Sequence, residues 1–193
     1  MPNAERVSVI RDILAAAIRA HEAMRDGDLA PIAEAARVMG DALKQGGQVL
    51  AFGNGGSAAD AQHFVAELVG RFGRERRAAA AIALTTDTSV LTAVANDYGF
   101  ERVFARQIEA LGRAGDVALG VSTSGRSANV LAGLQAARAR GVQCVALTGG
   151  EGGPIGRAAD VLVCVPERST ARVQEVHRTI LHAFCELIER DLT

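Results

Sequence analysis

The chain has 193 residues, of which 49% are apolar and 4% aromatic, and its formal net charge at pH 7 is −1. This length suits one domain with a sizeable core. The basic residues are spread along the sequence rather than clustered, so we expect no direct nucleic-acid binding. No apolar run could cross a bilayer and the N-terminus lacks a signal-peptide core, so we expect a cytoplasmic protein without membrane contact. Cys144, Cys164 and Cys185 lie far apart without metal-type spacing, which predicts buried thiols of a reducing compartment.

Two helices are predicted at the start of the chain. Apolar residues recur at helical spacing over 4–25 and over 29–44. Asp26-Gly27-Asp28 separates the two segments, and Gly46-Gly47 ends the second. We therefore expect one domain over 1–193, in which N-terminal helices (1–45) precede a core with a C-terminal helix (46–193).

Short apolar runs alternate with helical segments after residue 46. The runs have strand length and little polar alternation, as in a parallel sheet buried on both faces. Strands are predicted over 48–52, 81–84, 116–121, 142–147 and 160–165. Helices are predicted over 57–69, 87–95, 100–112, 127–140 and about 170–190. This alternation indicates an α/β fold with right-handed crossovers.

The first predicted strand ends in a glycine-rich loop, Gly53-Asn54-Gly55-Gly56-Ser57. A strand that turns through glycines into a helix favours an anion at the helix N-terminus. Gly53, Gly55 and Ala58 also match a dinucleotide-binding fingerprint. No acidic residue follows at the end of a second strand at the required distance of about 20 residues, so the dinucleotide interpretation is weak.

A second loop is rich in hydroxyl groups. Ser122-Thr123-Ser124-Gly125-Arg126-Ser127 leads from a strand into a helix. Hydroxyls and backbone N–H groups at a helix N-terminus suit a phosphate monoester, and no Walker lysine points to a nucleoside triphosphate. The alternative is that Ser127 only caps the helix. A third candidate loop, Ala95–Gly99 with Asn96 and Asp97, is also an ordinary turn sequence.

His63 and Glu67 lie four residues apart on a predicted helix and so share one face. An imidazole and a carboxylate beside a phosphate loop suit acid–base chemistry or a metal, although an exposed polar pair is the simpler interpretation. The last helix carries Gln174, His177 and His182. A single histidine on such a helix is more often a buried structural residue than a ligand.

The chain resembles the SIS (sugar isomerase) family, and within it the phosphoheptose isomerases. The resemblance runs nearly end to end, through GNGGSAADAQHFVAEL, VANDYGF, GVSTSGRSANV, LTGGEGG and RVQEVHRTILH. It implies a three-layer α/β/α fold with a five-stranded, flavodoxin-like parallel sheet and extra N-terminal helices. It also implies a homotetramer with active sites at subunit interfaces. We expect the first and last helices to pack against other chains.

The resemblance further implies a role for each candidate residue. Glu67 would be the catalytic base and His182 its acid/base partner. Zinc, one ion per subunit, would have His63, Glu67, Gln174 and His182 as ligands. The substrate-binding residues would be Asn54, Gly55, Gly56, Ser57, Glu67, Asn96, Asp97, Ser122, Thr123, Ser124, Ser127 and Gln174. His177 receives no role in the reaction.

The implied reaction converts sedoheptulose 7-phosphate to D-glycero-D-manno-heptose 7-phosphate through a cis-enediol, for the heptose of lipopolysaccharide and other surface glycans. Gln174 and His182 would lie about 12 Å apart on a continuous helix, too far for one ion. Either the helix begins after Gln174, or the two residues serve different sites, which an interface between chains would allow.

Two alternatives to this enzyme remain open. A non-catalytic SIS relative binds the bacterial replication initiator protein, and AIALTTDTSVLTAVAND and ERSTARVQEVH resemble it at least as well. That group does not retain Glu67 and His182, which favours the enzyme here. The other alternative is a sugar-phosphate sensor or an isomerase of another ketose phosphate.

Overall fold

The computed structural model describes residues 1–193 and contains one parallel sheet of five strands. The strands are β1 (Val49–Gly53), β2 (Ala81–Ala83), β3 (Val117–Ser122), β4 (Gln143–Gly149) and β5 (Val161–Val165). Their order in the sheet is β2-β1-β3-β4-β5. This is the doubly wound, flavodoxin-like order, so the predicted fold class is confirmed.

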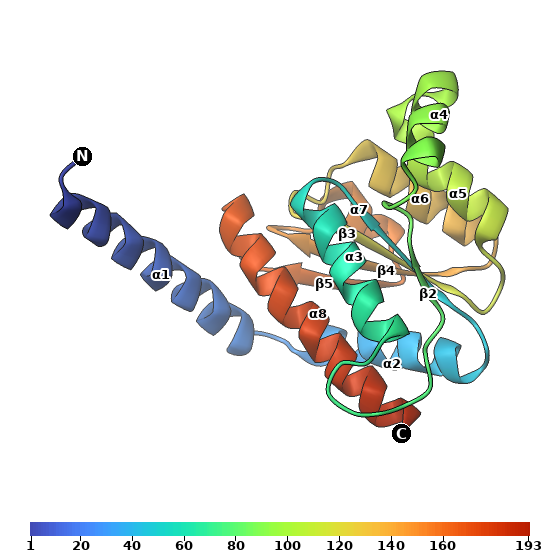
Figure 1. Ribbon diagram of the computed structural model, residues 1–193, viewed down its shortest axis with the longest axis horizontal. Coiled ribbons are helices and arrows are strands. Elements are labelled where there is room, and N and C mark those ends of the chain that lie inside the picture. The colour runs from blue at the N-terminus through green and yellow to red at the C-terminus, as the bar shows by residue number, and fades with distance from the viewer.

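Helices cover both faces of the sheet (Figure 1). They are α1 (Asn3–Arg25), α2 (Ala30–Lys44), α3 (Gly56–Val69), α4 (Thr88–Tyr98), α5 (Val103–Leu111), α6 (Ala128–Ala139), α7 (Gly153–Ala158) and α8 (Thr170–Leu192), with a 3₁₀ turn at Phe100–Arg102. The sequence did not predict α7, because six residues that begin Gly-Pro carry no helical periodicity.

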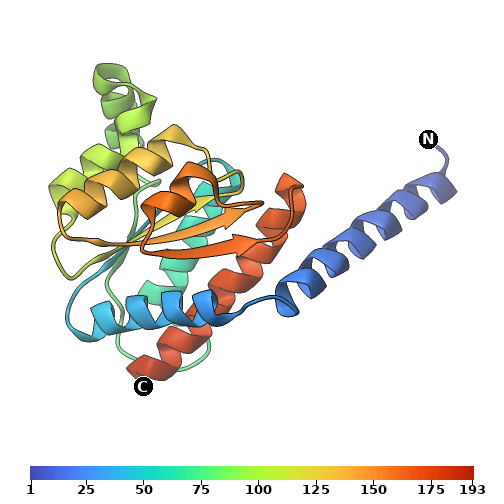
Figure 2. The same ribbon diagram turned by 180° about the vertical axis from the view of Figure 1, so that it is seen from behind.

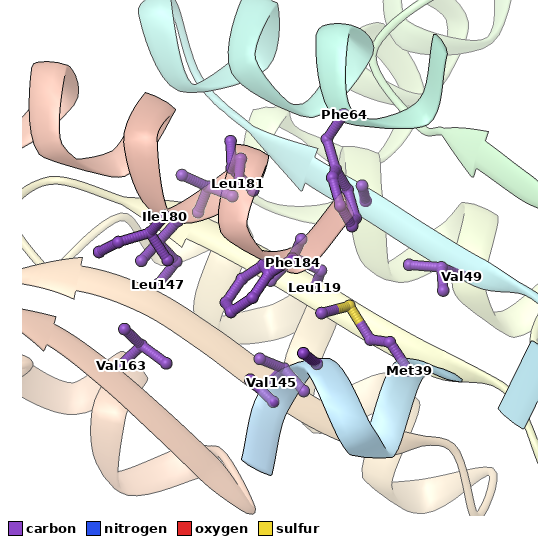
Figure 3. Packing of buried hydrophobic residues seen from close by; sticks show 14 of the residues in the cluster. Met39, Val49, Phe64, Leu119, Val145, Leu147, Val163, Ile180, Leu181 and Phe184 are labelled. Carbon is purple, nitrogen blue, oxygen red and sulfur yellow. The ribbon is translucent and has the colours of Figure 1, made fainter. Parts of the chain in front are cut away.

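The core lies in two layers, one on each face of the sheet. Buried side chains of α2, α3 and α8 pack against one face, and those of α5, α6 and α7 pack against the other. Figure 3 shows the first layer, where Phe64 of α3 and Phe184 of α8 meet above the strands. Their ring centroids are 6.2 Å apart in an edge-on arrangement. These contacts hold α3 and α8 side by side, which positions the site described below.

The two end helices differ from each other. Helix α1 projects from the body (Figures 1 and 2), and its apolar residues Val7, Ile10, Leu14 and Ile18 are exposed. In α8 the apolar face is buried within its own chain, so contacts of this helix with other chains, which stay a prediction, would have to use its other sides. The sequence could not separate these cases, because an apolar stripe does not specify which chain covers it. None of the helices is long and apolar enough to span a lipid bilayer.

Candidate active site

The first two candidate loops lie at the carboxyl end of the sheet, where β1 and β3 are neighbours. The chain leaves β1 toward β2 on one side and returns to β3 on the other, so this is the topological switch point of the sheet. Gly53 ends β1 beside Val121 of β3. A Cβ on Gly53 would lie 2.7 Å from the Val121 carbonyl oxygen and 2.8 Å from the Ser57 Cβ. Glycine at this position therefore lets the chain turn tightly into α3.

Two asparagines join the first and second loops. The Asn54 amide nitrogen donates to the Asn129 side-chain oxygen at 2.8 Å, and the Asn129 amide returns a 2.8 Å bond to Asn54. Asn129 is buried in the first turn of α6. Asn54 was predicted as a site residue, whereas Asn129 was missed, because no local pattern shows that two amides 75 residues apart will pair. The pair fixes the two loops relative to each other.

The hydroxyl loop presents its side chains at the start of α6. The Ser122 and Ser127 hydroxyl oxygens lie 3.0 Å apart, and Ser124 accepts a 3.2 Å bond from the Arg126 backbone N–H. Ser127 occupies the N-cap position, but its side chain makes no capping hydrogen bond. The simple capping interpretation of Ser127 is therefore wrong. The first N–H groups of this 12-residue helix lack a side-chain partner at the cap and remain available to an anion.

His63 and Glu67 meet His182 between α3 and α8. The Nε2 atoms of His63 and His182 are 2.8 Å apart, and the His63 Nε2 lies 3.7 Å from a Glu67 carboxylate oxygen. The side chains of His63 and Glu67 are 32% and 25% exposed. Burial lowers the pKa of His63, with a further decrease from the positive charge of Arg178. The three side chains, termed here the imidazole–carboxylate cluster, thus combine two imidazoles and a partly desolvated carboxylate.

The donor set of this cluster is one that zinc prefers, namely imidazole nitrogen and carboxylate oxygen. The two imidazoles are in hydrogen-bond contact through their Nε2 atoms, with 56° between the ring planes. No group of three or more His, Cys, Asp and Glu side chains is already arranged around a common point within this chain. The cluster therefore fits zinc by its chemistry, and the Glu67 carboxylate would have to approach the two imidazoles.

Gln174 lies apart from this cluster. It packs at the start of α3, where a Cβ on Gly56 would lie 2.0 Å from its side-chain nitrogen. Helix α8 begins at Thr170, so Gln174 and His182 are on one continuous helix and about 12 Å apart along its axis. Between them, Arg178 donates to the buried Asp60 of α3 at 2.9 Å. Gln174 therefore cannot share an ion with His182 of the same chain.

One further prediction changes, and one about His177 holds. Asn96 and Asp97 lie in the last turn of α4, so the predicted loop over 95–99 is mostly helical. Both are exposed, and the Asn96 amide donates to Asp97 at 2.8 Å. The sequence favoured a turn because Asn-Asp-Tyr-Gly has turn composition, but Gly99 only ends the helix. His177 is fully buried and its Nε2 lies 3.0 Å from the Thr148 carbonyl oxygen, as expected for a structural histidine.

Comparisons with known proteins show the family of this chain. The SIS domain family model matches residues 13–149. A phosphoheptose isomerase from Roseiflexus sp. is 57% identical over 161 residues, covering 83% of this chain and 81% of that protein. One from Geobacter sp. strain M21 is 55% identical over 181 residues, or 92% of this chain and 94% of that protein.

Solved structures agree as well. The phosphoheptose isomerase from Neisseria gonorrhoeae superimposes with a TM-score of 0.90 at 48% identity, over 98% of this chain and 100% of that one. The enzyme from Francisella tularensis gives a TM-score of 0.92 at 38% identity, over 96% and 98% of the two chains. Because sequence and structure agree over nearly the whole length, the chain belongs to the phosphoheptose isomerases of the SIS-domain family.

Proposed function

We propose that the protein is an aldose–ketose isomerase that converts sedoheptulose 7-phosphate to D-glycero-D-manno-heptose 7-phosphate. The observation that carries this proposal is the meeting of Glu67 with the imidazoles of His63 and His182 between α3 and α8. Relatives named phosphoheptose isomerase, at 52–57% identity, support the choice of sugar. The product would enter heptose synthesis for lipopolysaccharide and other surface glycans.

The reaction moves protons between neighbouring carbons and oxygens. Glu67 would remove a proton from C1 of the ketose while O2 gains a proton, which gives a cis-enediol. Loss of the O1 proton and protonation of C2 then yield the aldose, with His182 as the second acid/base group. Partial burial of Glu67 supports this role, because a general base must be held in a fixed position within reach of the substrate.

Zinc is part of the proposal. His63, Glu67 and His182 would hold it, one ion per subunit, and it would polarise the sugar oxygens when bound. Gln174 cannot reach this ion within one chain, so it would be a zinc ligand only at a site shared with a neighbouring chain. Such a shared site would agree with a homotetramer whose active sites lie between subunits. The exposed apolar side of α1 supports the same assembly.

The phosphate would lie at the N-terminus of α6, on Ser122, Thr123, Ser124 and Ser127. Its binding energy would orient the reacting carbons at the far end of the sugar. Asn54, Gly55, Gly56 and Ser57 would contact the sugar from the β1 loop. Asn96 and Asp97 are proposed as sugar contacts toward a neighbouring chain, since both are exposed on α4. A cytoplasmic location is proposed on the three unpaired cysteine thiols.

The test is turnover of sedoheptulose 7-phosphate, with and without added zinc, by the wild-type protein and by Glu67→Gln. Glutamine keeps the size of the side chain but removes the base, so kcat should fall by about 10²-fold or more. Substrate binding should change much less, because the phosphate loop lies elsewhere. Glu34→Gln is the matched control, since Glu34 forms an exposed ion pair with Arg37 on α2.

Bound zinc is measured on the same samples to separate the two roles of Glu67. Retained zinc with lost turnover supports the base. Lost zinc, with turnover restored by excess metal, would make Glu67 a ligand instead. A folded wild-type protein without turnover, with or without zinc, would contradict the proposal and favour the replication-initiator adaptor. Turnover of a different ketose phosphate, without turnover of sedoheptulose 7-phosphate, would change the substrate assigned to the enzyme.

A further inference from the structure

We infer that the buried pair Glu189–Arg76 positions His182, by holding the segment 70–77 so that Phe72 packs on the His182 imidazole. The segment 70–77 is termed here the anchored loop. The inference rests on the function proposed above for His182 and goes beyond it, because it adds residues that touch neither substrate nor metal.

Glu189 holds the anchored loop through its backbone. The carboxylate, only 1% exposed, accepts hydrogen bonds from the N–H groups of Phe72, Gly73 and Arg74 at 3.1, 2.9 and 2.7 Å. Three consecutive amides on one ionised acceptor form a strong and directional anchor. Burial alone would raise the pKa of Glu189, but these amides and Arg76 outweigh it and lower the pKa. The backbone of residue 72 is therefore fixed on α8.

Arg76 fixes the other end of the same loop. Its guanidinium is 2% exposed and its Nε lies 3.5 Å from the Glu189 carboxylate. The two terminal nitrogens donate to the carbonyl oxygens of Leu68 at 2.9 Å and Glu67 at 2.8 Å. A cation that donates to the last carbonyls of a helix also opposes the negative end of the helix dipole. Arg76 thus holds the end of α3 that carries Glu67.

The ring of Phe72 connects the anchored loop to His182 of the imidazole–carboxylate cluster. Its centroid lies 5.5 Å from that of His182, with 40° between the ring planes. His182 in turn has its Nε2 at 2.8 Å from that of His63. His182 and Glu189 are seven residues apart on α8, which places both on one face of the helix. One face of α8 therefore carries both the imidazole and the carboxylate that holds a ring against it.

Glu189→Gln tests the inference in the full-length protein. We expect kcat to fall by about 10-fold to 100-fold, the scale of a small displacement of a catalytic group. KM should change by less than about threefold, because the proposed phosphate loop follows β3 and Glu189 does not contact it. Phe72→Leu should lower kcat in the same way. The double variant Glu189→Gln/Phe72→Leu should be no slower than Glu189→Gln alone, since both substitutions disturb the same contact between Phe72 and His182. In the control double variant Glu34→Gln/Phe72→Leu, the two effects on kcat should be additive.

A second measurement does not depend on turnover. Histidine side-chain ¹⁵N spectra of the wild-type protein, Glu189→Gln, Phe72→Leu and Glu34→Gln report on the His182 imidazole directly. We expect its signals to shift in the first two variants and to remain in place in Glu34→Gln. A wild-type protein that is inactive toward sedoheptulose 7-phosphate would contradict the proposed function. The spectra would still test whether Glu189 and Phe72 position His182, because they do not require turnover.

A lowered melting temperature in Glu189→Gln, with kcat and the His182 signals unchanged, would overturn the inference and leave a purely structural ion pair. If Glu189→Gln does not fold, Phe72→Leu decides the question, because it leaves the ion pair and its backbone bonds in place. Unchanged kcat and unchanged His182 signals in Phe72→Leu would then overturn the inference.

Discussion

At the scale of single residues, buried polar side chains determine how the site is assembled. Asn54 and Asn129 satisfy each other across the β1 and β3 loops, and Asp60 neutralises Arg178 between α3 and α8. A buried polar group without a partner would cost about 1–3 kcal/mol. These pairs therefore favour one arrangement of the loops and helices that carry the candidate site.

His177 gives a pH-dependent contribution to stability. Burial lowers its pKa below 6.5, with smaller opposing effects from the Thr148 carbonyl and Asp60. The unfolded chain therefore binds a proton more readily than the folded one, so this contribution is present above pH 6.5 and is lost as pH falls through the folded pKa.

We expect the free energy of unfolding of the wild-type protein to decrease as the pH falls below about 6.5, and to decrease less in His177→Gln. Urea unfolding at several pH values measures this. His21→Gln is the control, because His21 lies on α1 and is partly exposed. Equal slopes for the wild-type protein and His177→Gln would contradict the assignment.

At the scale of elements, α8 both covers the sheet and carries His182. Its buried residues include Val173, Ile180, Leu181 and Phe184, which pack in the layer shown in Figure 3. The position of His182 relative to α3 therefore depends on how well α8 packs. A loss of packing next to His182 should affect stability and turnover together.

Phe184→Ala should lower the free energy of unfolding by about 3–5 kcal/mol, because it leaves a cavity where the ring meets Phe64. Leu187→Ala, three residues further on, should change it by about 0.5 kcal/mol, since Leu187 is 37% exposed. Urea unfolding midpoints with a shared m-value compare the two. Similar losses in both variants would show that Phe184 is not a core contact.

At the scale of the whole molecule, α1 carries a row of apolar side chains that its own chain leaves uncovered. Val7, Ile10, Leu14 and Ile18 recur along one side of it and are 47–60% exposed. The helix is tied to the body from its middle onward, where Arg172 donates to the Ile13 carbonyl oxygen at 3.1 Å and the His21 Nε2 lies 2.9 Å from the Thr179 hydroxyl oxygen. Such an apolar row is stabilised when another chain covers it.

We expect a tetramer of the wild-type protein by light scattering at micromolar concentration. Leu14→Glu should shift it to smaller species without loss of helix by circular dichroism, because a charge on the row opposes burial. Asp12→Ala, at an exposed polar position of the same helix, should leave the assembly intact. A monomeric wild-type protein would reject the tetramer.

The sequence alone determined the order of elements apart from α7, because helical periodicity and short apolar runs are local, and α3, α8 and all five strands lie where it predicted them. It also placed His63 and Glu67 on one face, since a spacing of four residues fixes this within a helix. The tertiary structure decided which distant side chains meet. It brought His182 to His63 across 119 residues, left Gln174 near Gly56 and paired Asn129 with Asn54. These contacts depend on how α3, α8 and the loops pack together, and that packing arises from long-range burial that no local pattern encodes.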